Sequence, residues 1–593
     1  MWPHLRSLCF TLPCFAMAAS ALPALAQWQA DGMPVCTAAN YQRYPHVVGD
    51  AAGGLIVTWM DNRSGTNWDI YAQRVNGAGV RQWAADGVAL CTAAGDQGFP
   101  PAVGDDGAPR IAADGAGGAI VVWSDGRGGA FSSDIYAQHV LASGVVDPLW
   151  PVDGRALCTA AQSQQSPAIV ADGAGGAIVA WKDLRNTGTD WDIYAQHVLA
   201  SGAVDPAWPA NGLALCTATS LQISLDIVSD GAGGAIVTWQ DFRSSTTGYD
   251  IYAQHVLASG ATDPAWPASG RAVCAATRSQ YSPKIVADGA GGAIVAWYDY
   301  RGGIKYDIYA QHVLASGAVD PVWPTDGRAL CTAAGDQDFP AMIIDGAGGA
   351  IVAWNDYRNG NDYDVYAQHV LASGAVDPAW PTDGRALAAA ASSQYYPTLV
   401  GDGAGGAIVA WGDSRSYPNY GIYVQHVLAS GTVDPAWPAN GRALCTAPNA
   451  RYYPTILGDG GGGAIVAWED LRNGTHYDIY AQRVYASGEV AEVPPTTAPA
   501  RLRMLPPYPN PSPGRLVRIP FELPSSGRVS AHVLDLAGHR VRTLVMDREF
   551  SAGREVLEWD GLNDERARVP AGVYFIRVRL GGHAEGRRLV LLE

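Results

Sequence analysis

Residues 172–185 read Asp-Gly-Ala-Gly-Gly-Ala-Ile-Val-Ala-Trp-Lys-Asp-Leu-Arg, and near copies of this stretch occur eight times in the 593-residue chain. The tryptophans of successive copies lie 57 or 58 residues apart, except where the second copy carries a six-residue insertion. Two other markers repeat in step, Trp-x-x-x-Gly from Trp28 and Asp-Ile-Tyr-Ala-Gln-Arg/His-Val from Asp69. A fixed period of this length indicates an array of identical supersecondary units.

Each repeat predicts four short strands, which in the third copy cover 156–158, 168–171, 177–181 and 193–199. The Ile-Val-Ala-Trp strand is apolar on both faces, as expected for a sheet covered on both sides, and the Gly-Ala-Gly-Gly turn accepts positive φ. The sequence therefore predicts an all-β, eight-bladed β-propeller over residues 27–490. A strand within Trp28–Cys36 would complete the last blade beside Ile479–Val484, whereas an open β-solenoid is the alternative.

Composition and the N-terminus narrow the class of protein. The chain is 48% hydrophobic and 16% charged, with 70 Gly and 20 Trp, which excludes disorder, coiled coil and collagen. One positive charge, an apolar stretch and Ala24-Leu25-Ala26 predict a signal peptide over residues 1–26. No later stretch reaches about 18 uncharged apolar residues, so we expect a secreted or outer-membrane surface protein without a membrane span after signal removal.

Charge separates two parts of the chain. Residues 27–496 carry a net charge of −22 and contain only three lysines, whereas residues 497–593 carry +4. An acidic ring is a poor phosphate binder, which argues against nucleic acid as a partner. The Asp-Gly-Ala-Gly-Gly turn lacks the alternating acidic run of a calcium loop. We therefore expect no cofactor and no metal site beyond weak calcium binding.

Cysteine and histidine recur at fixed positions of the repeat. Seven cysteines of the mature chain are equivalent by position, and their odd number and separate blades argue against disulfides; we expect buried apolar residues. Six histidines, from His139 to His426, share a strand position that Arg74 and Arg483 occupy in the first and last repeats. Because arginine does not replace a histidine ligand, the expectation is an exposed or stacking role and not a metal site.

Every repeat contains Trp-x-Asp-x-Arg. An Asp two residues before an Arg favours a charge-assisted hydrogen-bond lattice that pins loops or adjacent blades. The lattice residues are Asp61, Arg63, Asp125, Arg127, Asp183, Arg185, Asp241, Arg243, Asp299, Arg301, Asp356, Arg358, Asp413, Arg415, Asp470 and Arg472.

The loops after these arginines vary but nearly always end in an aromatic residue. A ring of aromatics on one face could stack on sugars or hold peptide segments, or each aromatic could cap its own blade. We name this set the outer aromatic ring, and it is the predicted ligand-binding site. Its members are Trp68, Trp191, Tyr249, Tyr306, Tyr363, Tyr420 and Tyr477.

The C-terminal part is a different unit. Residues 491–504 are rich in proline and predict an extended linker. Residues 505–593 contain six or seven short strands divided by Gly, Pro and Asp turns, which is typical of an immunoglobulin-like sandwich.

Five short motifs occur in order in this unit: Tyr508-Pro-Asn-Pro, Glu522-Leu-Pro, Leu534-Asp-Leu-Ala-Gly, Trp559-Asp-Gly and Ala571-Gly-Val-Tyr-Phe. They resemble the immunoglobulin-like domain named after the flagellar hook-capping protein, and the C-terminal sorting domains of type IX secretion. The resemblance implies a tag that is read by outer-membrane secretion machinery. The end of the chain has Arg587-Arg588 and no lysine, unlike many sorting domains, so a plain immunoglobulin-like module stays open. The repeats resemble bacterial extracellular propeller repeats of no identified family.

These features favour an extracellular binding or adhesion protein whose ligand is a glycan or a protein. The alternatives are a polysaccharide hydrolase or lyase of propeller fold, and a structural surface-layer protein. An enzyme needs an asymmetric acid and base, whereas most acids here recur in every repeat. Glu469, Asp362 and Asp105 occur in single repeats and are the first candidates for such a role, although surface charges are the simpler interpretation.

Overall fold

The computed structural model describes residues 28–98, 107–129, 132–186, 188–491, 502–504, 507, 517–550, 553–581 and 583–592. The predicted signal peptide therefore lies outside the described residues. The described chain divides into two compact units, one ending at Ala491 and the other beginning after it. It contains strands and no helix, which confirms the all-β prediction. No helix in the described residues is long and apolar enough to cross a membrane.

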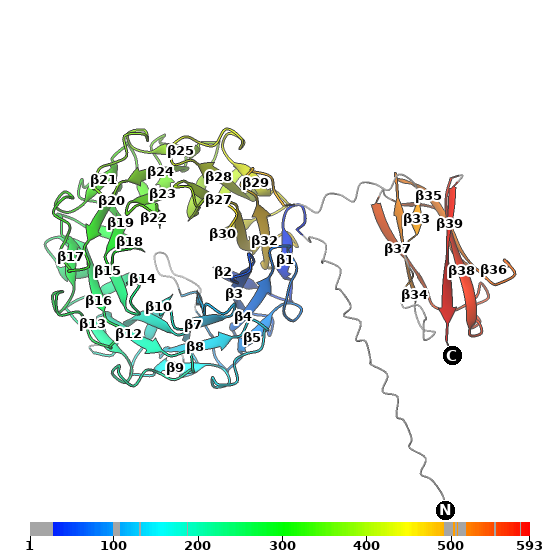
Figure 1. The fold of residues 1–593 in the computed structure, drawn as a ribbon, viewed down its shortest axis with the longest axis horizontal. Coiled ribbons are helices and arrows are strands. Elements are labelled where there is room, and N and C mark those ends of the chain that lie inside the picture. Colours follow the sequence, from blue (N-terminus) through cyan, green and yellow to red (C-terminus); the bar gives the residue numbers. More distant parts are fainter. Residues whose placement is uncertain are drawn as a thin grey trace, which may run out of the picture. The chain divides into compact units, whose positions relative to one another are not determined.

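The first unit is a ring of eight four-stranded antiparallel sheets, the blades of a β-propeller (Figure 1). The first strand of each blade lies innermost, and these strands contact their counterparts in the adjacent blades. Listed from the inside outward, the strands are β2 (Gln42–Gly49), β3 (Leu55–Asp61), β4 (Asp69–Val75) and β5 (Val88–Cys91) in blade 1; β6 (Arg110–Ala113), β7 (Ala119–Asp125), β8 (Asp134–Val140) and β9 (Arg155–Cys158) in blade 2; β10 (Gln164–Ala171), β11 (Ala177–Asp183), β12 (Asp192–Val198) and β13 (Leu213–Cys216) in blade 3; β14 (Gln222–Ser229), β15 (Ala235–Ser244), β16 (Gly248–Val256) and β17 (Arg271–Cys274) in blade 4; β18 (Gln280–Ala287), β19 (Ala293–Asp299), β20 (Asp307–Val313) and β21 (Arg328–Cys331) in blade 5; β22 (Gln337–Ile344), β23 (Ala350–Asp356), β24 (Asp364–Val370) and β25 (Arg385–Ala388) in blade 6; β26 (Gln394–Gly401), β27 (Ala407–Ser416), β28 (Asn419–Val427) and β29 (Arg442–Cys445) in blade 7; and β30 (Arg451–Gly458), β31 (Ala464–Asp470), β32 (Asp478–Val484) and β1 (Met33–Cys36) in blade 8.

The N-terminal strand closes the ring. In blade 8, β1 pairs antiparallel with β32, with Met33 opposite Ala481 and Cys36 opposite Ile479. Trp28 and Val35 are buried in a cluster shared by blades 8 and 1. The predicted closure is confirmed, and the array is not an open solenoid. The four strands expected for each repeat span two blades, because the outermost strand β9 pairs with β8 of the preceding sheet and not with β10.

The repeated Gly and Trp fix the blade interior. All seven residues of β11 are buried, because neighbouring blades cover both faces of this strand. Gly212, from the Trp-x-x-x-Gly marker, has φ +99° and lies against Trp181, where an added Cβ would meet the Trp181 Cη2 atom at 2.6 Å. Only glycine accepts both this backbone conformation and this approach.

The second unit consists of two sheets on a shared core. One sheet has the order β33 (Arg503–Met504), β34 (Val517–Leu523), β37 (Gly553–Trp559), and the other β36 (Arg540–Phe550), β35 (Gly527–Leu534), β38 (Gly572–Leu580), β39 (His583–Leu591). Phe521 and Trp559 of the first sheet pack with Ile576 of the second. Leu502 and Met504 are buried in the same core, so the expected linker over 491–504 reaches into this unit and its boundary at residue 505 is placed too late. The immunoglobulin-like topology stays a prediction.

Candidate functional site

The innermost strands share a β-bulge near their start. In β10 the register shifts between Gln165 and Ala168, and the residue inside the shift, Ser166, has φ +54°. A positive φ is uncommon for any residue except glycine, and bulges re-aim side chains. The equivalent residue has positive φ in seven of the eight blades, blade 2 with Ala108 being the exception: Tyr44, Ser166, Ser224, Ser282, Phe339, Tyr396 and Tyr453.

In blades 1, 3, 5 and 7, a polar side chain from the preceding blade holds the bulge in place. It belongs to the residue after the repeat's Trp, and it accepts a hydrogen bond from the backbone N–H of the bulge residue. This contact positions the inner wall of the ring, although the accepting residue differs from blade to blade. The pairs are Ser166 with Ser124 Oγ (3.2 Å), Ser282 with Gln240 Oε1 (2.6 Å), Tyr396 with Asn355 Oδ1 (2.9 Å) and Tyr44 with Glu469 Oε1 (2.6 Å).

Glu469 is one of these acceptors and not a surface charge. Its side chain is fully buried and also accepts a hydrogen bond from Arg43 Nε at 3.1 Å. Burial raises the pKa of Glu469 to about 7, against the lowering influence of Arg43 and the Tyr44 N–H. Asp362 accepts a hydrogen bond from Asn359 in its own loop, whereas Asp105 lies outside the described residues.

The bulge residues of four consecutive blades form an aromatic arc, which comprises Phe339, Tyr396, Tyr453 and Tyr44. Ring centroids are 5.9 Å apart for Phe339 and Tyr396, 5.8 Å for Tyr396 and Tyr453, and 5.3 Å for Tyr453 and Tyr44. Tyr396 and Tyr453 expose 42% and 39% of their surface. The arc therefore presents apolar ring faces to solvent on one side of the inner wall.

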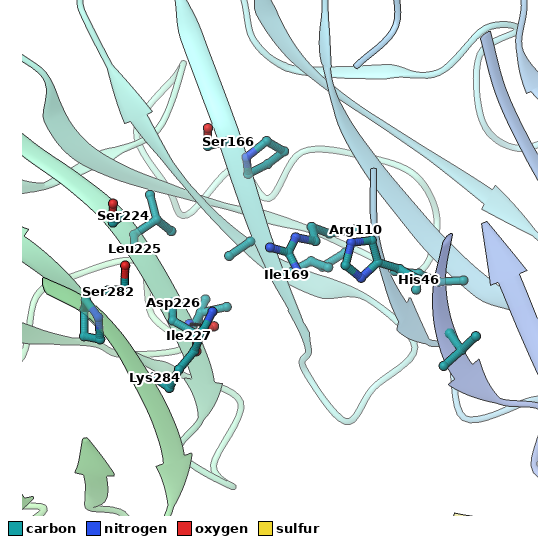
Figure 2. A pocket seen from close by; sticks show the side chains of 15 residues that line it. His46, Arg110, Ser166, Ile169, Ser224, Leu225, Asp226, Ile227, Ser282 and Lys284 are labelled. Atoms are coloured by element: carbon teal, nitrogen blue, oxygen red, sulfur yellow. Dashed lines mark hydrogen bonds between the residues drawn. The ribbon is translucent and has the colours of Figure 1, made fainter. Parts of the chain in front are cut away.

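Small polar residues occupy the bulge in blades 3 to 5, where Ser166, Ser224 and Ser282 stand in place of the aromatic residues. A hollow of about 220 Å³ lies against these blades and extends to β2 and β6 (Figure 2). Three small serine side chains take the place of rings that fill the wall elsewhere. The inner wall is thus aromatic on one side and hollowed on the other.

Charged side chains gather in this hollow. They occupy the fifth position of the innermost strand, which is small or neutral in the other blades: Ala168, Ala341, Thr398 and Thr455. Figure 2 shows Arg110 close to His46, and Lys284 beside Asp226. The Asp226 carboxylate accepts hydrogen bonds from the N–H groups of Ile227 (3.0 Å) and Ile285 (3.3 Å). Lys284 is half-buried and forms no ion pair or hydrogen bond through its side chain within the described residues.

The outer aromatic ring lies at the junctions between blades. All seven side chains are half-buried. Tyr249 contacts Tyr281 of the next blade at 5.8 Å between centroids, Tyr420 contacts Tyr452 at 5.2 Å, and Lys182 lies 4.5 Å from the Trp191 ring. The backbone carbonyls of Trp191, Tyr306, Tyr363 and Tyr477 accept the N–H of the first residue of the next innermost strand, and the Trp68 carbonyl accepts that of Gln97, which precedes β6. These residues join blades, and the more exposed rings belong to the aromatic arc.

The Asp–Arg pairs form a buried lattice in all eight repeats. In the third repeat, Asp183 accepts hydrogen bonds from Trp181 Nε1 (2.8 Å) and from Arg185 N and Nε (both 2.9 Å). The Arg185 guanidinium lies 3.9 Å from the Tyr194 ring centre and donates to the Asn211 carbonyl at 2.8 Å. The equivalent Trp–Asp hydrogen bond is present in all seven of the remaining repeats.

The repeated histidines and cysteines take part in packing. His197 lies between Asp205 (Nδ1, 2.8 Å) and Asp172 (Nε2, 3.0 Å), with its ring 5.9 Å from Trp208, so it is buried and not exposed as one expectation had it. The seven described cysteines are buried and free of disulfides, and burial raises the pKa of Cys158 to about 12. Within the described residues, no group of three or more His, Cys, Asp or Glu could hold a metal ion.

Comparison with known proteins adds a fold likeness only. No protein-family model and no curated protein matches this chain. A polysaccharide lyase of family PL25, an ulvan lyase bound to -[GlcA(1-4)Rha3S]-, matches at 9% identity over 78% of this chain and 96% of its own, with a TM-score of 0.39. A protein of unknown function from Dyadobacter fermentans matches at 10% identity over 77% and 96%, with a TM-score of 0.34. The α-L-arabinanase of Penicillium chrysogenum complexed with arabinobiose matches at 12% identity over 55% and 94%, with a TM-score of 0.31. Likenesses this distant do not show a shared function.

Proposed function

We propose that the propeller binds a saccharide chain at its inner wall. One observation carries this proposal. The exposed aromatic arc and the polar hollow are both formed by the innermost strands, at the positions where the repeats differ. Sugar rings present apolar C–H faces and hydroxyl edges, and binding sites for such ligands combine aromatic surfaces with a few convergent polar groups. Structural roles account for the lattice, the cysteines and the histidines, whereas nothing in the packing requires exposed rings at Tyr396 and Tyr453.

Cleavage of the chain by elimination is a second candidate function. Glycoside hydrolysis usually uses two carboxyl groups that flank the scissile bond. Among the described residues that line the hollow, however, Asp226 is the only carboxylate, and backbone N–H groups already hold it. Elimination needs instead a base and a cation close to an acidic sugar. His46 and Lys284 line the same hollow and could fill these roles. Release of an unsaturated sugar, followed by ultraviolet absorbance, tests this candidate.

Removing two rings of the arc tests the binding proposal. The double variant Tyr396→Ala, Tyr453→Ala should weaken binding of oligosaccharides at least tenfold in isothermal titration calorimetry, or about 1.4 kcal/mol, because two stacking surfaces are lost. The melting temperature should change little, since both side chains are partly exposed. Tyr417→Ala is the matched control, because Tyr417 is 73% exposed and lies outside the arc. Unchanged binding by the double variant would contradict the proposal.

We also propose that the second unit is a sorting module for export to the cell surface. Its separate core supports the proposal, because a tag must fold without help from its cargo. Truncation after Ala491 should leave the propeller in the periplasm, as measured by fractionation and surface immunolabelling. Surface display of the truncated chain equal to that of the full chain would refute this role.

A further inference from the structure

We infer that the hollow receives a carboxylate-bearing sugar, a uronate, and that Lys284 is the counter-ion of its carboxylate. This inference rests on the proposed saccharide binding at the inner wall. It adds the class of sugar and the residue that selects it.

Lys284 differs from the other lysines of the propeller. Lys305 forms a salt bridge with Asp307, and Lys182 lies against Trp191. Lys284 is half-buried as a residue in a part of the chain with a net charge of −22, yet its side chain has no partner of opposite charge within the described residues. A cation that lines a hollow without a partner can form a charge-assisted hydrogen bond with an anionic ligand.

Asp226 lies beside Lys284 in Figure 2, but no ion pair joins the two side chains. Its two oxygens accept the N–H groups of Ile227 and Ile285, which tie blade 4 to blade 5. Arg110 adds a second cationic side chain to the lining, and His46 adds a third basic group. The described residues of the lining thus include more basic than acidic groups, whereas the propeller as a whole is acidic.

The size of the hollow fits one sugar residue. At about 30 Å³ for each water molecule in the liquid, 220 Å³ corresponds to about seven waters. This space can take a single ring with its carboxylate. The neighbouring sugars of the chain would then meet the aromatic arc. The three serines that create the hollow also supply hydroxyl groups at its rim.

Calorimetry on the full mature chain tests this assignment. The ligands are oligosaccharides of galacturonate, glucuronate and mannuronate, each compared with its carboxyl-reduced neutral form of equal length. The unchanged protein should bind at least one acidic form tenfold or more tightly than its neutral form, and added salt should reduce the difference. Lys284→Met should abolish the preference without changing neutral binding, and Lys284→Arg should retain most of it. Lys305→Met is the control of equal charge change.

The outcomes separate the two proposals. Equal binding of acidic and neutral forms, or an unchanged preference in Lys284→Met, would overturn the uronate assignment and leave saccharide binding intact. Binding of a sulfated neutral oligosaccharide as tight as that of the uronates would overturn the choice of a carboxylate. Failure of every acidic and neutral saccharide to bind would overturn the proposed function itself. Thermal unfolding of each variant shows whether it remains folded.

Discussion

Replacing Asp183 by alanine is expected to lower the free energy of unfolding of the propeller by about 3–5 kcal/mol, the usual cost of removing one partner from a buried ion pair. The Asp183 carboxylate is fully buried and accepts the Trp181 indole N–H, the backbone N–H of Arg185 and the Arg185 guanidinium. Without it, a buried indole N–H and a partly buried cation lose their acceptor. Urea unfolding followed by tryptophan fluorescence measures the change.

A double-mutant cycle distinguishes this pair from simple loss of packing. Arg185→Leu keeps an apolar side chain near Tyr194 and removes the cation that Asp183 neutralises. If the pair is the cause, Asp183→Ala combined with Arg185→Leu should cost clearly less than the sum of the single changes. Additive costs, or a loss below about 1 kcal/mol for Asp183→Ala, would show that the lattice contributes little to stability.

The repeat itself made most of the propeller predictable. The period located the blades, and the N-terminal Trp28–Cys36 segment predicted the closing strand that pairs with β32. The spacing of Asp183 and Arg185 likewise indicated contact, because a two-residue separation after a strand allows a local ion pair. Such features depend on local spacing, which a single sequence contains.

The aromatic arc and the hollow of the inner wall were not predicted, because they depend on a register shift that no local sequence pattern indicates. Tyr396 and Ser224 occupy the same bulge position, yet one supplies an exposed ring and the other leaves space. An alignment of the repeats shows that the second, third and fifth residues of the innermost strand vary, whereas the first is nearly always Gln and the fourth nearly always Pro. Ligand-binding residues were expected in the variable loops, whereas Lys284 lies in a strand. Glu469 stood out in the sequence because it occurs in a single repeat. In the structure it is buried and accepts the Tyr44 N–H, so it positions Tyr44.

The repeat places two aspartates opposite each other on paired strands in most blades. In seven blades the lattice Asp lies directly opposite the first Asp of the next strand, as Asp183 does opposite Asp192. Like charges opposite each other are destabilising. Burial and the neighbouring acid raise the pKa of six of these second carboxyls to about 6: Asp69, Asp134, Asp192, Asp250, Asp364 and Asp478. Blade 7 has Gly421 at this place, opposite Asp413.

Stability should therefore increase as the pH falls from about 8 to about 5. A carboxyl with a folded pKa of about 6 and a reference pKa of 3.8 binds its proton more tightly in the folded state. Its contribution to stability is complete below about pH 4 and is lost as the pH rises through 6. An opposite effect begins below about pH 4, because His255 and two backbone N–H groups lower the pKa of Asp230 despite its burial. Stability should therefore be highest at about pH 4 to 5, which thermal unfolding of the full mature chain at pH 4 to 8 measures.

The variant Asp192→Asn isolates the effect of one such carboxyl. Asparagine resembles the protonated acid, so at pH 8 the variant should be more stable than the unchanged protein by about 1–3 kcal/mol, given about 1.4 kcal/mol for each unit of pKa difference. The advantage should shrink as the pH falls from 7 to 4, because the unchanged protein then takes up the proton itself. Glu489→Gln, which removes an exposed carboxylate, is the matched control. An advantage of Asp192→Asn that is equal at pH 8 and pH 4 would mean that hydrogen bonding, and not the charge of Asp192 opposite Asp183, sets the difference.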